Sequence, residues 1–208
     1  MSFKMLERVL LYRGQKTYET IVKNIRRVLP VVKVNEGLWI ASNADVILGD
    51  VEFISNVAKL ISDMIVEFRP DLIVTPEAKS IAFAYQVARE LGHSRIVVAR
   101  KSVKSYMESY VVENVKSITT NSVQTLVLTA EDVNRVRDRK ICILDDVVST
   151  GSTLTALENL VDRAGGRTVC RASIWLEGPW YKRELLYLSE LPIFVSEEKF
   201  KELNKQFK

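Results

Sequence analysis

The most informative segment of this 208-residue chain reads Ile141-Cys142-Ile143-Leu144-Asp145-Asp146-Val147-Val148-Ser149-Thr150-Gly151-Ser152-Thr153. Its first four residues are apolar, which is typical of a parallel strand that is buried on both faces. Asp145 and Asp146 follow at the carboxyl end of that strand, the edge at which open α/β sheets bind their ligands. The pattern therefore predicts a strand, a short loop and a helix over 152–164, with a ligand at their junction.

The residues at this junction suit a phosphorylated sugar. Two neighbouring carboxylates can accept hydrogen bonds from the hydroxyls of a ribose. The loop 149–153 offers backbone N–H groups and hydroxyls to an anion, beside the positive N-terminus of a helix. No lysine follows Gly151 in the GxxxxGK[ST] spacing, which argues against a nucleoside-triphosphate P-loop. We therefore predict a ribose 5-phosphate pocket; the alternative is a loop in which Ser and Gly only cap a helix.

Segment 141–153 resembles the signature of the type I phosphoribosyltransferases: four apolar residues, two acids, two apolar residues, two small residues, Gly, any residue, and Ser or Thr. The resemblance implies a doubly wound α/β fold with a mainly parallel sheet, a small N-terminal cap and a C-terminal helix. It also implies displacement of diphosphate from 5-phosphoribosyl 1-diphosphate by a nucleobase nitrogen. Asp145 and Asp146 would take part in catalysis and substrate binding. The loop residues that would bind substrate are Val148, Ser149, Thr150, Gly151, Ser152 and Thr153.

Length and composition fit one such domain. Hydrophobic residues make up 47% of the chain, and no apolar run approaches the roughly 20 residues that a membrane-spanning helix needs. The net charge of +4 does not demand a nucleic-acid partner, and the N-terminus lacks a signal-peptide pattern. We therefore expect a cytoplasmic protein with no membrane or nucleic-acid partner. Its one domain, 1–208, would comprise a cap (about 1–49), a core (about 50–178) and a C-terminal extension (about 179–208).

Strand and helix patterns alternate through the core, which predicts a doubly wound sheet. The expected strands are 72–75, 96–99, 125–129, 141–144 and 169–176, and the expected helices are 50–68, 80–91, 152–164 and 197–207. Before the core, the first thirty residues have the pattern of a basic amphipathic helix. Residues 31–34 and 38–41 are expected as short β pieces in an irregular cap, where Trp39 could stack on a base.

Two further segments carry cations or amides at strand ends on the ligand edge. Residues 75–80 resemble the diphosphate loop of the family; Glu77, Ala78, Lys79 and Ser80 would bind substrate there. Residues 98–104 supply Arg100, Lys101 and Lys104, which can meet a diphosphate, and Arg100 is also a catalytic candidate. The alternatives are an ordinary capping turn and a solvated basic surface.

The polar stretch 102–122 is expected to act as a lid that excludes water from the reaction. Within it, Glu108 is the candidate catalytic acceptor of the purine N9 proton, by analogy with adenine-specific members of the family. A loop carboxylate without a catalytic role is the alternative.

The substrates and partners follow from the resemblance. Adenine is favoured because the acidic pair is Asp-Asp and because the Arg-Lys stretch and the Leu176-Glu177-Gly178 turn are similar to adenine-specific members. We therefore expect purine salvage, with AMP and diphosphate as products. Mg²⁺ would be bound mainly through the substrate, without a protein-built metal site, and the protein would be a homodimer. The alternatives are a xanthine or hypoxanthine/guanine transferase and a regulatory protein that senses phosphoribosyl diphosphate.

Cys142 and Cys170 both lie in expected strands among apolar neighbours. Buried thiols that act as small hydrophobic side chains are the favoured interpretation, over a disulfide or a metal site.

Overall fold

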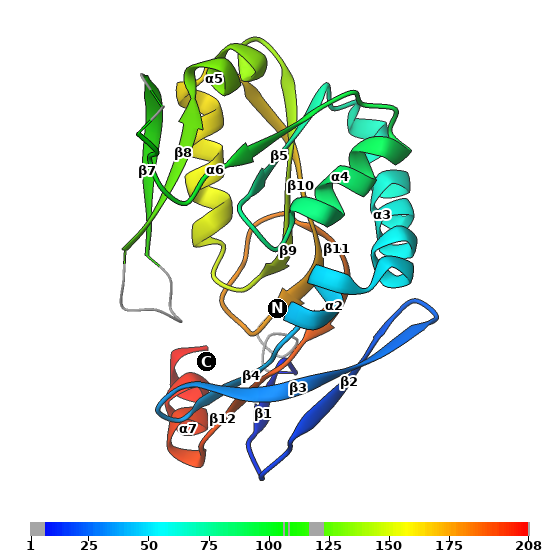
Figure 1. Cartoon of the computed structure of the whole chain (residues 1–208). Coiled ribbons are helices and arrows are strands. Elements are labelled where there is room, and N and C mark those ends of the chain that lie inside the picture. Colours follow the sequence, from blue (N-terminus) through cyan, green and yellow to red (C-terminus); the bar gives the residue numbers. More distant parts are fainter. Residues whose placement is uncertain (1–6, 106, 108, 117–122, 208) are drawn as a thin grey trace.

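The central sheet of the protein consists of five parallel strands (Figure 1). The structure is a computed structural model and describes residues 7–105, 107, 109–116 and 123–207. The strand order is β11–β10–β9–β5–β6. Their bounds are β5 Leu72–Pro76, β6 Ile96–Ala99, β9 Lys140–Val148, β10 Arg167–Glu177 and β11 Leu186–Leu191. The predicted doubly wound, mainly parallel sheet is confirmed.

Helices cover both faces of this sheet, as Figure 1 shows. α3 (Val51–Ile65) and α4 (Ile81–Glu90) pack on one face, and α6 (Ser152–Arg163) packs on the other. Alternate side chains of β9 supply the two cores: Cys142 and Leu144 join the α3 and α4 side, while Ile141 and Ile143 join the α6 side. The uninterrupted apolar run in β9 is therefore buried on both faces, as its sequence predicted.

Most of the expected core helices form where their end signals place them. Asp50 accepts a hydrogen bond from the Phe53 N–H and caps α3, and a 3₁₀ turn (η1, Val66–Phe68) ends this segment before Pro70. Gly92 follows α4 with a φ of +75°, and the next N–H, of His93, bonds to the Ala88 carbonyl. The terminal helix α7 (Glu197–Gln206) also forms. No helix in the described ranges is long and apolar enough to cross a membrane.

The N-terminal segment is a β-hairpin, so the expected amphipathic helix was wrong. Strands β2 (Thr17–Val22) and β3 (Ile25–Asn35) pair antiparallel around a turn with Lys23 at φ +56°. Side chains alternate between faces: Leu29 is buried and Val28 is exposed. The segment is rich in Thr, Ile and Val, which favour strands. Outward-facing Arg and Lys are compatible with the spacing of a helix and with that of a strand. Pairing of β3 with β4 (Leu38–Ala41) favours the strand.

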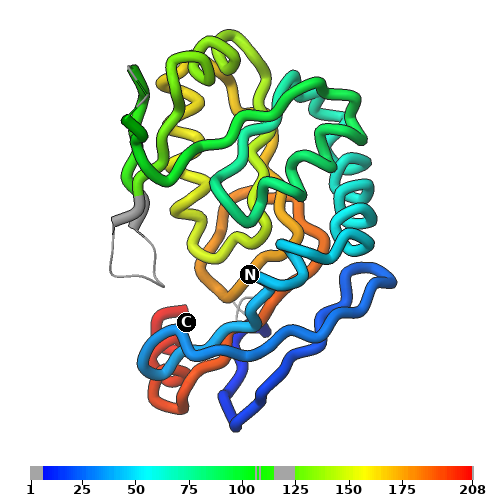
Figure 2. The backbone as a smooth tube through the Cα atoms, in the orientation of Figure 1, coloured from blue at the N-terminus to red at the C-terminus, as the bar shows by residue number. Residues whose placement is uncertain are grey.

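The cap is one five-stranded sheet that uses both ends of the chain. Its order is β1–β12–β4–β3–β2, with β1 at Val9–Leu11 and β12 at Ile193–Val195. Figure 2 shows the blue N-terminal and red C-terminal segments together below the core, where β1 and β12 pair in parallel. Strands β11 and β12 were not expected. Residues 44–49, for which only an irregular cap was expected, form the short helix α2 (Ala44–Gly49), which connects the cap to the core.

Strand β8 (Val123–Thr129) does not join the central sheet, which corrects the expected alternation. It pairs antiparallel with β7 (Tyr110–Lys116), so part of the expected lid is a β-ribbon. The ribbon packs on α6, where Arg163 Nη1 donates to the Val112 carbonyl at 2.6 Å. It is followed by the short helix α5 (Ala130–Val136), which the sequence did not indicate. Polar residues between Val111 and Val115 concealed the alternating pattern.

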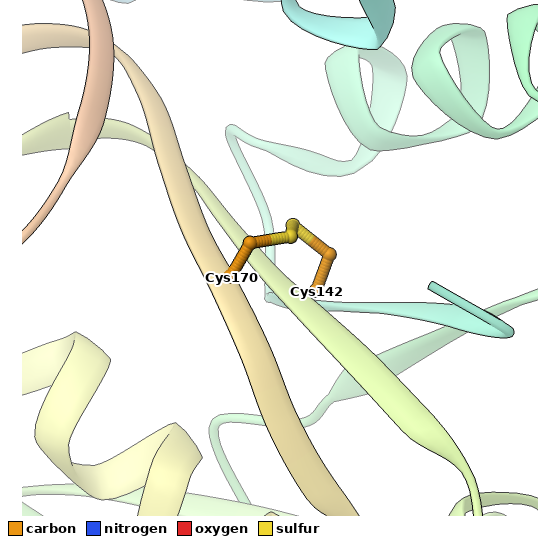
Figure 3. Close-up of a disulfide and its surroundings, with 2 residues drawn as sticks. All are labelled: Cys142 and Cys170. Atoms are coloured by element: carbon orange, nitrogen blue, oxygen red, sulfur yellow. A yellow bond between two sulfur atoms is a disulfide. The ribbon is translucent and has the colours of Figure 1, made fainter. Parts of the chain in front are cut away.

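Cys142 and Cys170 form a disulfide, so the favoured interpretation as free thiols was wrong (Figure 3). The two residues are direct register partners on β9 and β10, with Cα atoms 4.7 Å apart. Both side chains lie in the core beneath α3 and α4. Sequence spacing alone cannot reveal such a pair, because it depends on which strands become neighbours in the sheet.

The disulfide gives the first testable prediction. It closes a loop with a sequence separation of 28, and loss of that constraint should lower the free energy of unfolding by about 3 kcal/mol. Urea titrations of the oxidised chain and of the chain refolded with reductant measure the difference. A Cys142→Ala/Cys170→Ala double variant is the control and should not respond to reductant. Two reactive thiols in freshly purified, unfolded protein would contradict the assignment.

Candidate functional site

The anion loop connects β9 to α6 at the carboxyl edge of the central sheet. Gly151 begins the helix with a φ of +79°, and a Cβ at this position would lie 2.3 Å from the Tyr181 ring. Glycine is therefore required both by backbone conformation and by the ring packed against it. The hydroxyls of Thr150 and Ser152 lie 2.9 Å apart. Together with the N-terminus of the 12-residue α6, this loop can hold a phosphate.

The loop lines one side of a cavity of about 240 Å³. All six residues from Val148 to Thr153 contribute to its wall, together with Asp145 and Lys79. A second cavity adjoins the first, because Lys79, Asp145, Val147 and Thr153 line both. The structure thus brings the predicted ribose and phosphate residues around two adjoining cavities.

The two carboxyls of the acidic pair are buried, and a serine hydroxyl lies between them. Asp145 and Asp146 are 8% and 3% exposed. Ser80 Oγ lies 2.7 Å from Asp145 Oδ1 and 3.0 Å from Asp146 Oδ1. The Asp146 N–H donates to Asp145 Oδ1 at 2.9 Å. Two ionised carboxylates that are this close and this shielded from solvent would repel each other strongly. The pair therefore favours a state with one negative charge.

A lysine and an asparagine decide which of the two carboxyls carries the charge. Lys79 Nζ donates to Asp146 Oδ2 and to Asn43 Oδ1, both at 3.0 Å, and Asn43 Nδ2 donates to Asp146 Oδ2 at 2.7 Å. Burial alone would raise the pKa of Asp146, but the Lys79 charge and these hydrogen bonds outweigh it and lower the pKa. Burial and the Asp146 charge raise the pKa of Asp145 to about 8. Asp146 is therefore the ionised member near neutral pH, and Asp145 carries the proton.

The segment 77–80 forms the far wall of the second cavity, where the sequence predicted a diphosphate loop. Glu77, Ala78, Lys79 and Ser80 all line it, and the Glu77–Ala78 peptide bond is cis. Glu77 Oε2 accepts a hydrogen bond from the backbone N–H of Lys101 at 2.8 Å, and Lys101 lines the same cavity. The structure thus places Lys101 and the 77–80 segment together with the acidic pair.

Two predicted residues, Arg100 and Lys104, do not line either of these cavities. The Arg100 backbone pairs with Val127, and Arg100 lines a separate cavity beside α5. Lys104 is exposed, and neither of the two joined cavities includes it. Glu108 lies outside the described residues, so its prediction remains open.

Trp39 is occupied elsewhere, which corrects its expected role in stacking on a base. Its ring stacks on Tyr12 with centroids 4.0 Å apart, within the cap sheet. The cap wall of the first cavity is formed instead by the neighbouring residues Ile40, Ala41 and Ser42.

Sequence reasoning missed two residues of the site. Asn43 bonds to Asp146 across 103 positions of sequence, and no local pattern signals that contact. Glu177 ends β10, is 6% exposed and lines the first cavity. Burial raises its pKa to about 7, although a hydrogen bond with Ser149 and the Lys79 charge oppose the shift. The position of Glu177 at a strand end on the ligand edge was the available signal.

Comparisons with known proteins agree with this geometry. A family model described as phosphoribosyl transferase domain matches residues 44–200. The chain is 31% identical to adenine phosphoribosyltransferase of Petrotoga mobilis over 112 residues, which are 52% of this chain and 60% of that protein. It is also 31% identical to the purine biosynthesis transcriptional repressor PurR of Bacillus subtilis over 116 residues, 56% of this chain and 40% of that protein. The chain thus spans less than two thirds of the length of these two relatives.

A solved structure shares the fold. Adenine phosphoribosyltransferase of Thermoanaerobacter pseudethanolicus superposes with a TM-score of 0.64 and 19% identity. The match covers 78% of this chain and 95% of that one.

The raised pKa of Asp145 predicts how stability depends on pH. Between its ordinary value of 3.8 and its folded value of about 8, the native state holds a proton that the unfolded state releases. Stability should therefore fall as the pH rises through this window. Asp145→Asn removes the titrating group. The free energy of unfolding of this variant, relative to that of the wild type, should therefore be higher at pH 8 than at pH 5. Urea unfolding at both pH values measures this, with exposed Asp63→Asn as the control. An advantage that does not change with pH would contradict the assigned protonation.

Proposed function

The chain belongs to the phosphoribosyltransferase family, and we propose that it transfers the phosphoribosyl group of 5-phosphoribosyl 1-diphosphate to adenine, forming AMP and diphosphate. The observation that carries this proposal is the pair of adjoining cavities lined by the anion loop, the acidic pair and the 77–80 segment. These three parts match the three charged or hydroxylated parts of the donor substrate. Adenine as the acceptor is supported by the Asp145-Asp146 pair and by the name of the Petrotoga relative.

The reaction breaks the bond between C1′ and a diphosphate oxygen and forms a bond between C1′ and N9 of the base, which loses its proton. Negative charge grows on the leaving diphosphate. Lys79 and Lys101 line the same cavity and would hold that group by charge and position. The anion loop would fix the 5′-phosphate, and Asp145 would contact the ribose hydroxyls. No covalent intermediate with the protein is required.

Mg²⁺ would enter bound to the diphosphate oxygens and to water, and it would neutralise part of the leaving-group charge. The donor set in the cavity suits a metal that arrives with its substrate. Within the described residues, no group of three or more His, Cys, Asp or Glu side chains could hold a metal ion.

Arg100, Lys104 and Glu108 keep their proposed roles as predictions. Arg100 lines a separate cavity in this structure, so contact with the diphosphate would require its side chain to leave that cavity. We also expect a cytoplasmic homodimer that acts on small molecules and needs no nucleic acid or membrane.

The decisive experiment incubates the chain with phosphoribosyl diphosphate, Mg²⁺ and one base at a time. Adenine should give AMP, while hypoxanthine, guanine and xanthine should give little nucleotide. Preferred formation of another nucleotide would replace adenine by a 6-oxopurine or xanthine. The match to a transcriptional repressor favours one further candidate, a regulatory protein that senses phosphoribosyl diphosphate. Binding of phosphoribosyl diphosphate without nucleotide formation from any base would support that function instead.

Substitution of Thr150 tests the phosphate loop. Thr150→Val removes one hydroxyl from the cavity wall and keeps the side-chain shape, while the backbone amides of the loop remain. We expect the KM for phosphoribosyl diphosphate to rise about 10-fold, as for the loss of one hydrogen bond to a charged group. Thr150→Ser keeps the hydroxyl and is the matched control. Equal KM values for the two variants would place the 5′-phosphate elsewhere.

A further inference from the structure

The first cavity has a part that neither the phosphate nor the ribose explains. Residues 149–153 form its anion end, and Asp145 with Lys79 forms its middle. The remaining wall is mostly apolar and comes from several separate elements, among them the cap and the ends of β9, β10 and β11. Besides Asn43, Val148 and Leu154, its members are Ile40, Ala41, Ser42, Val147, Leu191 and Glu177. An apolar wall with few polar groups is the usual surroundings of a planar heteroaromatic ring.

Glu177 is the one ionisable side chain among these six residues. It ends β10, opposite Leu191 in the register of β11. It is 6% exposed and shares a hydrogen bond with Ser149, the residue that begins the anion loop. The charged groups near it are Lys79, which precedes α4, and Asp146 on β9; Ser149 is neutral. A buried carboxyl beside an open cavity needs a partner of its own there.

The contact with Ser149 indicates which edge of a base Glu177 would face. Ser149 is the first residue of the loop that would hold the 5′-phosphate, so Glu177 lies at the phosphate side of the cavity. In a nucleotide with the usual anti conformation, the imidazole edge of a purine lies on the same side as its 5′-phosphate. Glu177 should therefore face N7 and the substituent at C6, rather than N1 and C2.

We propose that Glu177 determines base specificity by forming two hydrogen bonds with the N7/C6 edge of a 6-aminopurine, one through each carboxyl oxygen. The proposal rests on the proposed function and assigns the residue that selects its acceptor. In a 6-aminopurine the amino group donates and N7 accepts. A protonated carboxyl accepts the first bond and donates the second. A 6-oxopurine presents two acceptors on this edge, so a protonated carboxyl can satisfy only one of them.

The surroundings of Glu177 favour the protonated form. Its pKa of about 7 means that the proton is held below neutral pH and lost above it. Ionised Glu177 would repel N7, so recognition of the aminopurine should weaken as the pH rises through 7.

The test compares AMP, IMP and ribose 5-phosphate binding by calorimetry. Ribose 5-phosphate occupies only the phosphate and ribose parts, so the affinity ratio of AMP to ribose 5-phosphate isolates the base. This ratio also cancels the titration of the phosphate and of Asp145, which both ligands share. For the wild type, the ratio should be higher at pH 6 than at pH 8.5, and AMP should bind more tightly than IMP.

Two variants separate recognition from packing. Glu177→Gln can make the same two bonds at any pH, so its ratio should match the wild type at pH 6 and stay unchanged at pH 8.5. Glu177→Leu should lower the ratio about 10-fold at pH 6 and remove most of the preference for AMP over IMP. Ribose 5-phosphate should bind both variants as tightly as the wild type.

Other outcomes overturn the proposal in distinguishable ways. An unchanged ratio in Glu177→Leu would show that Glu177 does not contact the base. A parallel loss of AMP and ribose 5-phosphate binding would show that Glu177 acts only through Ser149 on the anion loop, and would leave the proposed function standing. A wild-type chain that binds neither AMP nor ribose 5-phosphate would overturn the proposed function and this inference with it.

Discussion

The contact between Lys79 and the buried Asp146, completed by Asn43, is the constraint on which the site depends. Its three members come from the segment before α4, the end of β9 and the residue before α2. Asp146 is 3% exposed, and a carboxylate so deeply buried is tolerated only with a cation and hydrogen bonds beside it. Because Asn43 lies two residues after the end of the cap strand β4, the same contact fixes the cap wall relative to the acidic pair. One set of contacts thus fixes both the position of the cap wall and the negative charge of Asp146.

A second set of contacts, made by the β2–β3 hairpin, also holds the cap on the core. Trp175 of β10 stacks on Phe53 of α3 with centroids 5.4 Å apart, and its Nε1 donates to Thr20 Oγ1 at 3.2 Å. Arg27 pairs with Asp50, which also caps α3. The hairpin therefore contacts the start of α3 and the carboxyl-terminal part of β10. The cap is anchored at two places, and the cavity lies beside the anchor formed by Asn43.

The features of the fold and the site that were predicted from the sequence are those that a short, continuous sequence pattern indicates. The apolar run before Asp145 identifies a doubly buried strand, and Gly151 marks the loop because its positive φ belongs to that turn. The 77–80 segment was found because it lies where a strand ends and a helix begins. Asn43 enters the site through a contact made only after folding. Glu177 had a local signal, its position at a strand end on the ligand edge, which was not used to assign it to the site. The β2–β3 hairpin was missed for a reason related to that for Asn43. The spacing of its charged residues fits a helix as well as a strand, and the pairing of β3 with β4, which depends on the fold, favours the strand.

The cavity resolves a conflict between its own charges and those of its substrate. Asp145, Asp146 and Glu177 line a space proposed to bind two anionic groups, and three ionised carboxylates there would oppose that binding. The directions of their pKa shifts remove the conflict: Asp145 and Glu177 are shifted toward the protonated form, while Asp146 stays ionised against Lys79. Near neutral pH and below, the local charge is then close to zero before substrate enters. Burial, which makes ionised carboxyls costly, thus converts two of them into neutral hydrogen-bonding groups suited to hydroxyls and base edges, and leaves the helix N-terminus and Lys101 to attract the anions.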